Sequence, residues 1–464
     1  MQQRIQPIRR ITSVLLALLS LAFATGCSLF DPVVSVGSPS PALSSSATPE
    51  ETAAIETPSK KPAETPQGSA PILPNASPDE ANGSGAYTIA ADVSESQKTY
   101  HSKLPDENAL RVENVAIAGV DGARVEKRAG DSSSLENSLL FGLNAAVLAR
   151  GNAQLLLVES DVTAAALGAG GVFAYGGRVQ LENSVVRATG ASSYSLAASG
   201  GGSISAKESN LSTQGALSPA LVAGKKGELF LDGGMAATGG EDSPVILSEG
   251  SVTASSATLR ANNAEAITVS GGSVNLTDCA VSGRMGDPST SGTQLSPYCV
   301  ALVESGGMGG AQSSFSMTRG ALSALSGDLF YVTNTEARIY LEGVSLSLSE
   351  GRALLRIGGN DGTRGWGEAG KNGADCAVIA KNQELGGDIV VDELSSVSLT
   401  LRGTTVYSGN INAANTARAA KVTLEDGATW ILTGDAFLTA FTGRVGGIVT
   451  NGFTVYVNGV ALTN

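Results

Sequence analysis

The sequence predicts an all-β protein whose body, residues 87–464, is a single-stranded right-handed parallel β-helix of about eleven coils. Three observations lead to this prediction. An apolar pattern returns roughly every 24 residues, the apolar runs are too short to form the stripe of a helix, and only 5% of the residues are aromatic beside 58 glycines. A core with few aromatic side chains must be filled by many thin layers of Val, Ile, Leu and Ala. Stacked coils provide such layers, because each coil packs only on its neighbours.

Residues 1–27 have the features of a bacterial lipoprotein signal peptide. Three arginines precede the apolar run of residues 11–24, which is too short for a comfortable membrane span. The run ends in Ala24-Thr25-Gly26-Cys27, which resembles a lipobox, the motif whose cysteine receives a diacylglyceryl group. The alternative is an ordinary secretory signal with an incidental cysteine. Both alternatives predict an exported chain, and the lipobox predicts lipidation of Cys27 and attachment to the outer face of the cell membrane.

Residues 28–86 are rich in Pro, Ser, Thr and Ala, as in SPSPALSSSATPEETAA. Such a segment cannot bury enough apolar area to offset the entropy of ordering the chain, so we expect a disordered stalk. A stalk of this kind would hold the β-helix away from the membrane.

Two apolar units repeat in phase along residues 87–464. The first reads apolar, any, apolar, two variable residues, a small residue, any, apolar; it starts at Leu155, Val179, Ile204, Leu229, Val252, Val274, Phe315, Ile339 and Leu399. The second is a short apolar strand; it starts at Ala146, Gly171, Ser195, Ala220, Val245, Ala266, Cys299, Leu329 and Ala353. The small sixth position of the first unit predicts a confined corner. Parallel crossovers favour the right hand, and the alternative folds, a sandwich or a propeller, have longer strands.

Several stretches resemble a known group of proteins. They are DENALRV from Asp106, NAAVLA from Asn144, GVFAYGG from Gly171, FYVTNTEA from Phe330, GGNDGTRGWGEAGKNGAD from Gly358 and TWILTGDAFLTAF from Thr429. Together they resemble adhesin-like surface β-helix proteins of Gram-positive bacteria. The resemblance spans about residues 100–441 and implies a pectate-lyase-like right-handed β-helix with no established activity.

Composition excludes several functions. A net charge of −13 disfavours binding to nucleic acid, which requires a basic face. The single His101 makes Ser/His/Asp catalysis and histidine-based zinc binding implausible. Three cysteines remain after Cys27, and Cys279 and Cys299 lie about one repeat apart, so a disulfide between them and two buried free thiols are both open.

Aligning the repeats gives the first candidate site, a set of charged residues that project outward. Glu182, Lys207 and Asp232 fall in one column, and Glu208 and Asp278 fall in the next. Neighbouring side chains about 4.8 Å apart could share a cation such as Ca²⁺ or flank a glycosidic bond. The alternative is that these charges only keep a solvated turn soluble.

The second candidate site is the glycine-rich loop of residues 358–375. Its polar and aromatic residues are Asn360, Asp361, Arg364, Trp366, Glu368 and Asp375. Trp366 is one of only two tryptophans, and a tryptophan among glycines can stack on a sugar ring. The loop fits neither the EF-hand nor the RTX calcium pattern, and the alternative is a tryptophan that merely covers the side of the β-helix.

These features predict a non-enzymatic cell-surface module that binds a polysaccharide or a host or matrix polymer through the side of the β-helix. We predict no catalytic residues, no cofactor, no nucleic acid partner and no membrane contact except through the lipid anchor. The first alternative is a Ca²⁺-dependent polysaccharide lyase or another polysaccharide-degrading enzyme. The second is a structural spacer without a ligand.

Overall fold

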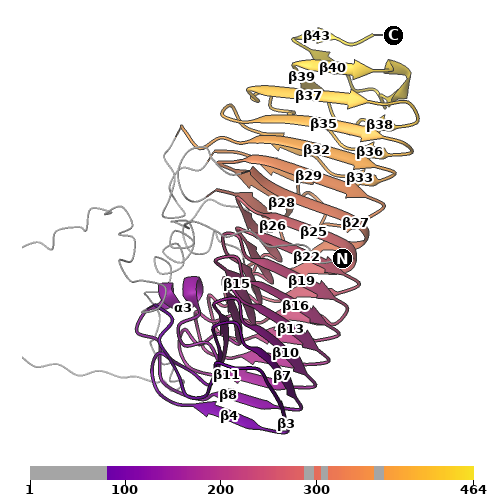
Figure 1. Ribbon diagram of the computed structural model, residues 1–464. Coiled ribbons are helices and arrows are strands. Elements are labelled where there is room, and N and C mark those ends of the chain that lie inside the picture. The colour runs from indigo at the N-terminus through magenta and orange to yellow at the C-terminus, as the bar shows by residue number, and fades with distance from the viewer. Residues whose placement is uncertain (1–80, 287–296, 305–311, 360–369, 464) are drawn as a thin grey trace, which may run out of the picture.

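The computed structural model describes residues 81–286, 297–304, 312–359 and 370–463. Figure 1 shows a rod of stacked coils that rises from the indigo N-terminal end to the yellow C-terminal end. Neighbouring coils pair through parallel strands almost throughout, so the predicted all-β parallel β-helix is confirmed. Pairing begins with β1 (Ser84–Gly85) on β5 (Glu107–Asn108), just before the start expected at Tyr87.

One wall of the rod is a 12-stranded parallel sheet with one strand from each successive coil. Its strands are β2 (Thr88–Ile89), β6 (Leu110–Val112), β9 (Val147–Arg150), β12 (Val172–Tyr175), β15 (Leu196–Ser199), β18 (Leu221–Ala223), β21 (Ile246–Ser248), β24 (Ile267–Ser270), β26 (Tyr298–Val303), β28 (Asp328–Thr333), β31 (Leu355–Ile357) and β34 (Ile389–Val391). The number of coils, counting the strands after β34, is larger than the eleven or so that were expected. The coils at the two ends depart from the repeated sequence pattern, so the pattern alone undercounts them.

The other walls belong to a 22-stranded sheet that bends at a corner into two arms. The first arm consists of β3 (Val93–Ser96), β7 (Ile117–Asp121), β10 (Gln154–Val158), β13 (Arg178–Glu182), β16 (Ser203–Lys207), β19 (Glu228–Asp232), β22 (Ser251–Ser255), β25 (Ser273–Gly283), β27 (Gln312–Ala324), β29 (Glu336–Glu342), β32 (Asp375–Lys381), β35 (Ser396–Arg402), β37 (Ala419–Leu424) and β40 (Ala440–Gly443). The second arm consists of β4 (Thr99–Ser102), β8 (Arg124–Lys127), β11 (Asp161–Ala164), β14 (Val185–Ala188), β17 (Asn210–Thr213), β20 (Met235–Thr238), β23 (Thr258–Ala261), the later halves of β25 and β27, and β30 (Ser345–Ser347).

Smaller elements complete the fold. A 4-stranded sheet contains β33 (Glu384–Gly386), β36 (Val406–Ser408), β38 (Thr429–Ile431) and β41 (Ile448–Val449). A 3-stranded sheet at the C-terminal end contains β39 (Ala436–Leu438), β42 (Val455–Val457) and β43 (Val460–Ala461). The described residues include α3 (Leu135–Phe141) and the short 3-10 helix η2 (Val445–Gly447). No helix in the described part of the chain combines the length and apolar character that a membrane crossing requires.

Alternation of side chains explains the first arm. In β13 the second and fourth residues, Val179 and Leu181, are buried, and the three between and around them are exposed. The register keeps like positions together, so Val179 lies beside Ile204 of β16, and Ile204 beside Leu229 of β19. The apolar columns therefore run continuously along the interior. The outward columns do not contribute to the core, so their residues can be polar, charged or aromatic.

The corner between the two arms explains why the sixth position of the first repeated unit holds a small residue. One residue there has a left-handed backbone, for example Asn183 with φ 48°, and the next side chain turns inward. Ser160, Ser184 and Ser209 occupy this inward position and are at most 2% exposed. The Ser184 hydroxyl oxygen accepts the Ser160 N–H at 3.1 Å, and Ser209 does the same for Ser184 at 3.3 Å. Each hydroxyl thus satisfies a buried backbone donor of the neighbouring coil.

The N-terminal end of the rod closes with a polar cap. Glu95 of β3 lies beside the buried Val120 of β7, and so terminates an interior apolar column with a carboxylate. Lys98, Tyr100 and Tyr87 all donate hydrogen bonds to it. Burial alone would raise the pKa of Glu95, but these three donors together lower it below its ordinary value. A capped end is what a solenoid needs to prevent further stacking.

The three described cysteines are buried free thiols, which decides between the two alternatives left open for Cys279 and Cys299. Burial raises the pKa of Cys299 and that of Cys376 each to about 12, so neither thiol forms a thiolate near neutral pH. These cysteines fill small positions in the core.

Candidate functional site

The first predicted column of charges lies in register on the outward face of the first arm. Glu182 of β13 is the partner of Lys207 of β16, and Lys207 is the partner of Asp232 of β19. All three side chains are exposed. The lysine thus separates the two carboxylates, and adjacent members are about 4.8 Å apart at the backbone.

The second predicted column does not form one group. Glu208 and Asp278 both occupy the left-handed corner position, with φ 45° and 55°, but two coils lie between them. Asp278 instead accepts two hydrogen bonds from the Arg319 guanidinium, at 2.7 and 2.6 Å. These bonds lower the pKa of the Asp278 carboxyl. The structure therefore does not bring Asp278 beside Glu208 to share a ligand.

Most of the second candidate site falls outside the described residues, namely Asn360, Asp361, Arg364, Trp366 and Glu368. Asp375 is described and is the exposed first residue of β32. Its carboxylate accepts hydrogen bonds from Ser396 and Arg418 of the following coils.

A shallow groove of about 220 Å³ opens on the same outward face, directly beside the column of Glu182, Lys207 and Asp232. It is lined by Arg178, Val179 and Gln180 of β13, Ser203 and Ser205 of β16, and Glu228 and Phe230 of β19. The two serines are short, so the middle strand forms a floor between longer side chains of the strands on either side. We define these lining residues as the Phe230 groove.

The aromatic ring is the unusual part of this groove. Phe230 is 44% exposed, although only 5% of the residues in the chain are aromatic. It projects outward because it lies between the buried Leu229 and Leu231. The sequence pattern did not predict the groove, because the repeated unit is defined by its apolar positions and not by the outward residues between them. The signal that could have found it is a phenylalanine at an outward position of a strand.

The arrangement offers groups that can bind a sugar. An exposed ring with an amide, two hydroxyls and a few charges around it can stack on a sugar and hydrogen-bond its hydroxyl groups. Glu182 and Asp232 are open to solvent, without the apolar enclosure that prepares a carboxylic acid to donate a proton in glycoside hydrolysis. Among the described residues, no three His, Cys, Asp or Glu side chains come together to hold a metal ion.

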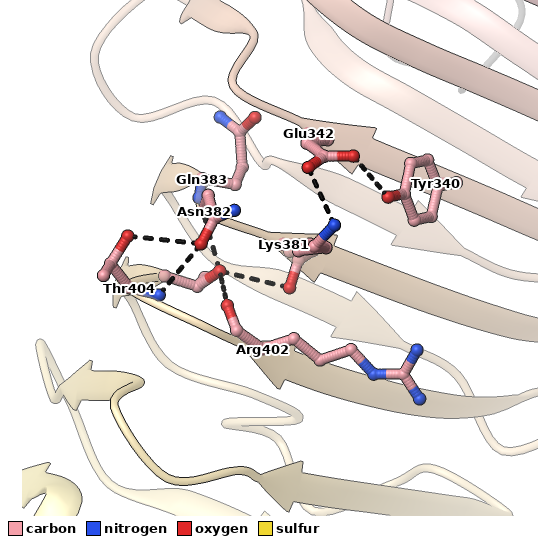
Figure 2. Close-up of polar contacts among 9 residues, drawn as sticks. Tyr340, Glu342, Lys381, Asn382, Gln383, Arg402 and Thr404 are labelled. Carbon is pink, nitrogen blue, oxygen red and sulfur yellow. Dashed lines mark hydrogen bonds and ion pairs between the residues drawn. The ribbon is translucent and has the colours of Figure 1, made fainter.

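A second polar cluster lies farther along the same face (Figure 2). The Tyr340 hydroxyl donates to Glu342 at 2.6 Å, and Lys381 pairs with the same carboxylate at 3.0 Å. The hydrogen bonds from Tyr340 and Lys381 lower the pKa of Glu342, and the bond to Glu342 raises the pKa of both Tyr340 and Lys381. The cluster thus fixes the orientation of the Tyr340 ring.

The adjacent corner is held by amide side chains. Asn382 accepts the Thr404 N–H at 3.2 Å, as Figure 2 shows. Gln383 is buried and bonds both the N–H and the carbonyl of Val344, each at 2.7 Å. These contacts continue the corner of the β-helix and have a structural role.

No protein-family model and no curated protein matches the chain.

Proposed function

We propose that this chain is a cell-surface lipoprotein whose β-helix binds polysaccharide, without enzymatic activity, through the Phe230 groove. The observation that supports this most is the exposed ring of Phe230 beside the serine strand β16, with the Gln180 amide on the far side of Ser205. The resemblance to adhesin-like surface proteins agrees with it. Residues 28–86 would be the stalk, Cys27 the attachment to the outer face of the membrane, and the groove the contact with a surface polymer.

The competing proposal is a Ca²⁺-dependent polysaccharide lyase. It requires a cluster of carboxylates for the ion and a base beside it. In the described residues the charged column of Glu182, Lys207 and Asp232 places a lysine between two carboxylates, which favours mutual neutralisation over cation binding. Binding without turnover is therefore the proposal that we favour.

Replacing Phe230 tests the proposal. The purified full-length chain is screened on a polysaccharide array, and the affinity for the best ligand is measured by calorimetry. Phe230→Ala should weaken binding about ten-fold or more, because it removes the stacking surface. Met235→Ala is the matched control, since Met235 lies on the same coil with a similar exposed fraction, 41%, but on the second arm.

Two results would contradict the proposal. One is that no polysaccharide on the array binds the chain, which would favour a spacer. The other is the appearance of unsaturated uronate, detected by ultraviolet absorbance, when pectin-like polymers and Ca²⁺ are supplied, which would establish a lyase.

A further inference from the structure

A second aromatic ring lies in line with Phe230 along the rod. The pairing registers place Phe230, Thr253, Asn275, Ser316 and Tyr340 side by side in one outward column, from β19 to β29. Four strand spacings of about 4.8 Å separate the two rings, or roughly 19 Å. Tyr340 is half-buried, and its hydrogen bond to Glu342 holds the ring in place at this end.

On the first arm, up to the corner, the outward side chains of the three coils between the rings are uncharged. Their outward positions are Ser251, Thr253, Ser255, Ser273, Asn275, Thr277, Ser314, Ser316 and Thr318. The charged outward positions of the first arm lie on the coils that carry the rings, with Glu228 and Asp232 at one end and Arg338 and Glu342 at the other. At the corner of the intervening coils, Asp278 and Arg319 form an ion pair with each other. We define the nine uncharged outward residues, from Ser251 to Thr318, as the polar floor.

The centre of the polar floor has unused hydrogen-bonding groups. In the described part of the chain, the side chains of Thr253, Asn275 and Ser316 have no hydrogen-bond partner within the protein. At the edges, Ser255 donates to Asp232 at 2.8 Å and Ser273 donates to Ser251 at 3.2 Å. A ligand along the middle column would therefore meet free hydroxyl and amide groups of both polarities.

We propose that the Phe230 groove is one end of a track that runs along the rod to Tyr340 and binds an extended, uncharged polysaccharide. This inference rests on the proposed function and names its ligand class. A β-linked hexose chain advances about 5 Å per ring, close to the strand spacing of about 4.8 Å, so a segment of about five sugars places its first and last sugars at the two aromatic rings. Each ring stacks on a terminal sugar of this segment, and the polar floor hydrogen-bonds the sugars between them.

The charge of the floor selects the ligand class. A polyuronate carries a negative charge on each sugar, and binding it would require a lysine, an arginine or a cation along the track. The polar floor offers no charged side chain of either sign. Desolvating a uronate there would cost free energy with no compensating ion pair, whereas a neutral sugar pays no such cost.

The track is tested with oligosaccharides of increasing length. Calorimetry measures the affinity of the full-length chain for neutral β-linked glucan, xylan and mannan oligosaccharides of two and six sugars, with polygalacturonate as the charged comparison. We expect the hexamer of one neutral series to bind about ten-fold or more tightly than its dimer, and more tightly than polygalacturonate. Tyr340→Ala should lose this gain for the hexamer and leave the dimer unaffected. Tyr340→Phe, which keeps the ring, should retain most of it.

The outcomes separate the track from the groove. If Phe230→Ala weakens binding but Tyr340→Ala binds the hexamer like the unmodified chain, the track is wrong and the groove stands. Equal affinity for dimer and hexamer, or tighter binding of polygalacturonate, would also overturn the track. If Phe230→Ala leaves all affinities unchanged, the proposed function itself fails.

Discussion

Gly240→Ala is expected to lower the free energy of unfolding by about 3 kcal/mol, because the added methyl group has no space. Gly190, Gly215 and Gly240 stack at the corner where the second arm ends, and each lies against the backbone of the coil before it. A Cβ on Gly240 would lie 1.8 Å from the Gly215 carbonyl oxygen, far inside contact distance. The coils would have to separate, and this would break the ladder on both sides.

The neighbouring residue supplies the control. Gly239 is exposed, and a Cβ there would be 3.8 Å from its nearest neighbour, the Thr213 carbonyl oxygen. Gly239→Ala should be neutral or stabilise by up to about 1 kcal/mol, since alanine restricts the unfolded chain. Urea unfolding followed by circular dichroism measures both variants. Similar midpoints for the two would mean that the coils are not packed as closely as described.

Cys27→Ala is expected to release the protein from the membrane or leave it unprocessed, because the proposed lipid anchor is attached at Cys27. The two acyl chains of a diacylglyceryl group contribute about 0.8 kcal/mol per buried methylene, which suffices for stable retention. Cys27 precedes the β-helix, so the circular dichroism spectrum should not change. Detergent phase partitioning of the processed protein measures the effect, and Ser28→Ala is the control that keeps the thiol. If the Cys27→Ala chain still partitions into detergent like its parent, only the secretion signal remains.

The interior of the β-helix was predictable because it obeys a local rule. Two alternating apolar residues and a small corner residue recur along the coils. The structure buries the apolar pairs and most of the corner residues, for example Leu181 and Ser184, whereas the corner glycine Gly320 is exposed. The prediction at the last repeat was wrong by one residue. Thr404 is exposed and Thr405 takes the buried place, because Lys381 pairs with Arg402 but Glu384 pairs with Val406, which leaves one extra residue in that corner.

Helix α3 was missed because it is short and breaks the repeat. Its local signals are nevertheless present: the Ser134 hydroxyl caps the N-terminus by accepting the Asn137 N–H, and Gly142, with φ 75°, ends the helix. Its residue Leu139 packs in a cluster with Phe173 on the outward face of the 12-stranded sheet. Only the folded structure shows that α3 covers apolar residues on the outward face of the 12-stranded sheet.

The candidate site was predictable in part. The column of Glu182, Lys207 and Asp232 followed from aligning the repeats, since in-register pairing turns equal positions into neighbours. The line of residues from Phe230 to Tyr340 could not be predicted in this way. An insertion in the sequence separates the coil of β25 from that of β27, and it obscures which outward residues of the two coils are neighbours. Tertiary register, rather than local pattern, places the two rings in one line.

The most direct test of the central claim, that polysaccharide binds at the Phe230 groove, is hydroxyl-radical footprinting with and without saturating ligand. Phe230 and Met235 have similar exposed fractions, 44% and 41%, and lie on different walls of one coil. The account predicts that bound polysaccharide slows the oxidation of Phe230 and leaves that of Met235 unchanged. Unchanged oxidation of Phe230 in the bound protein, or equal protection of both residues, would contradict it.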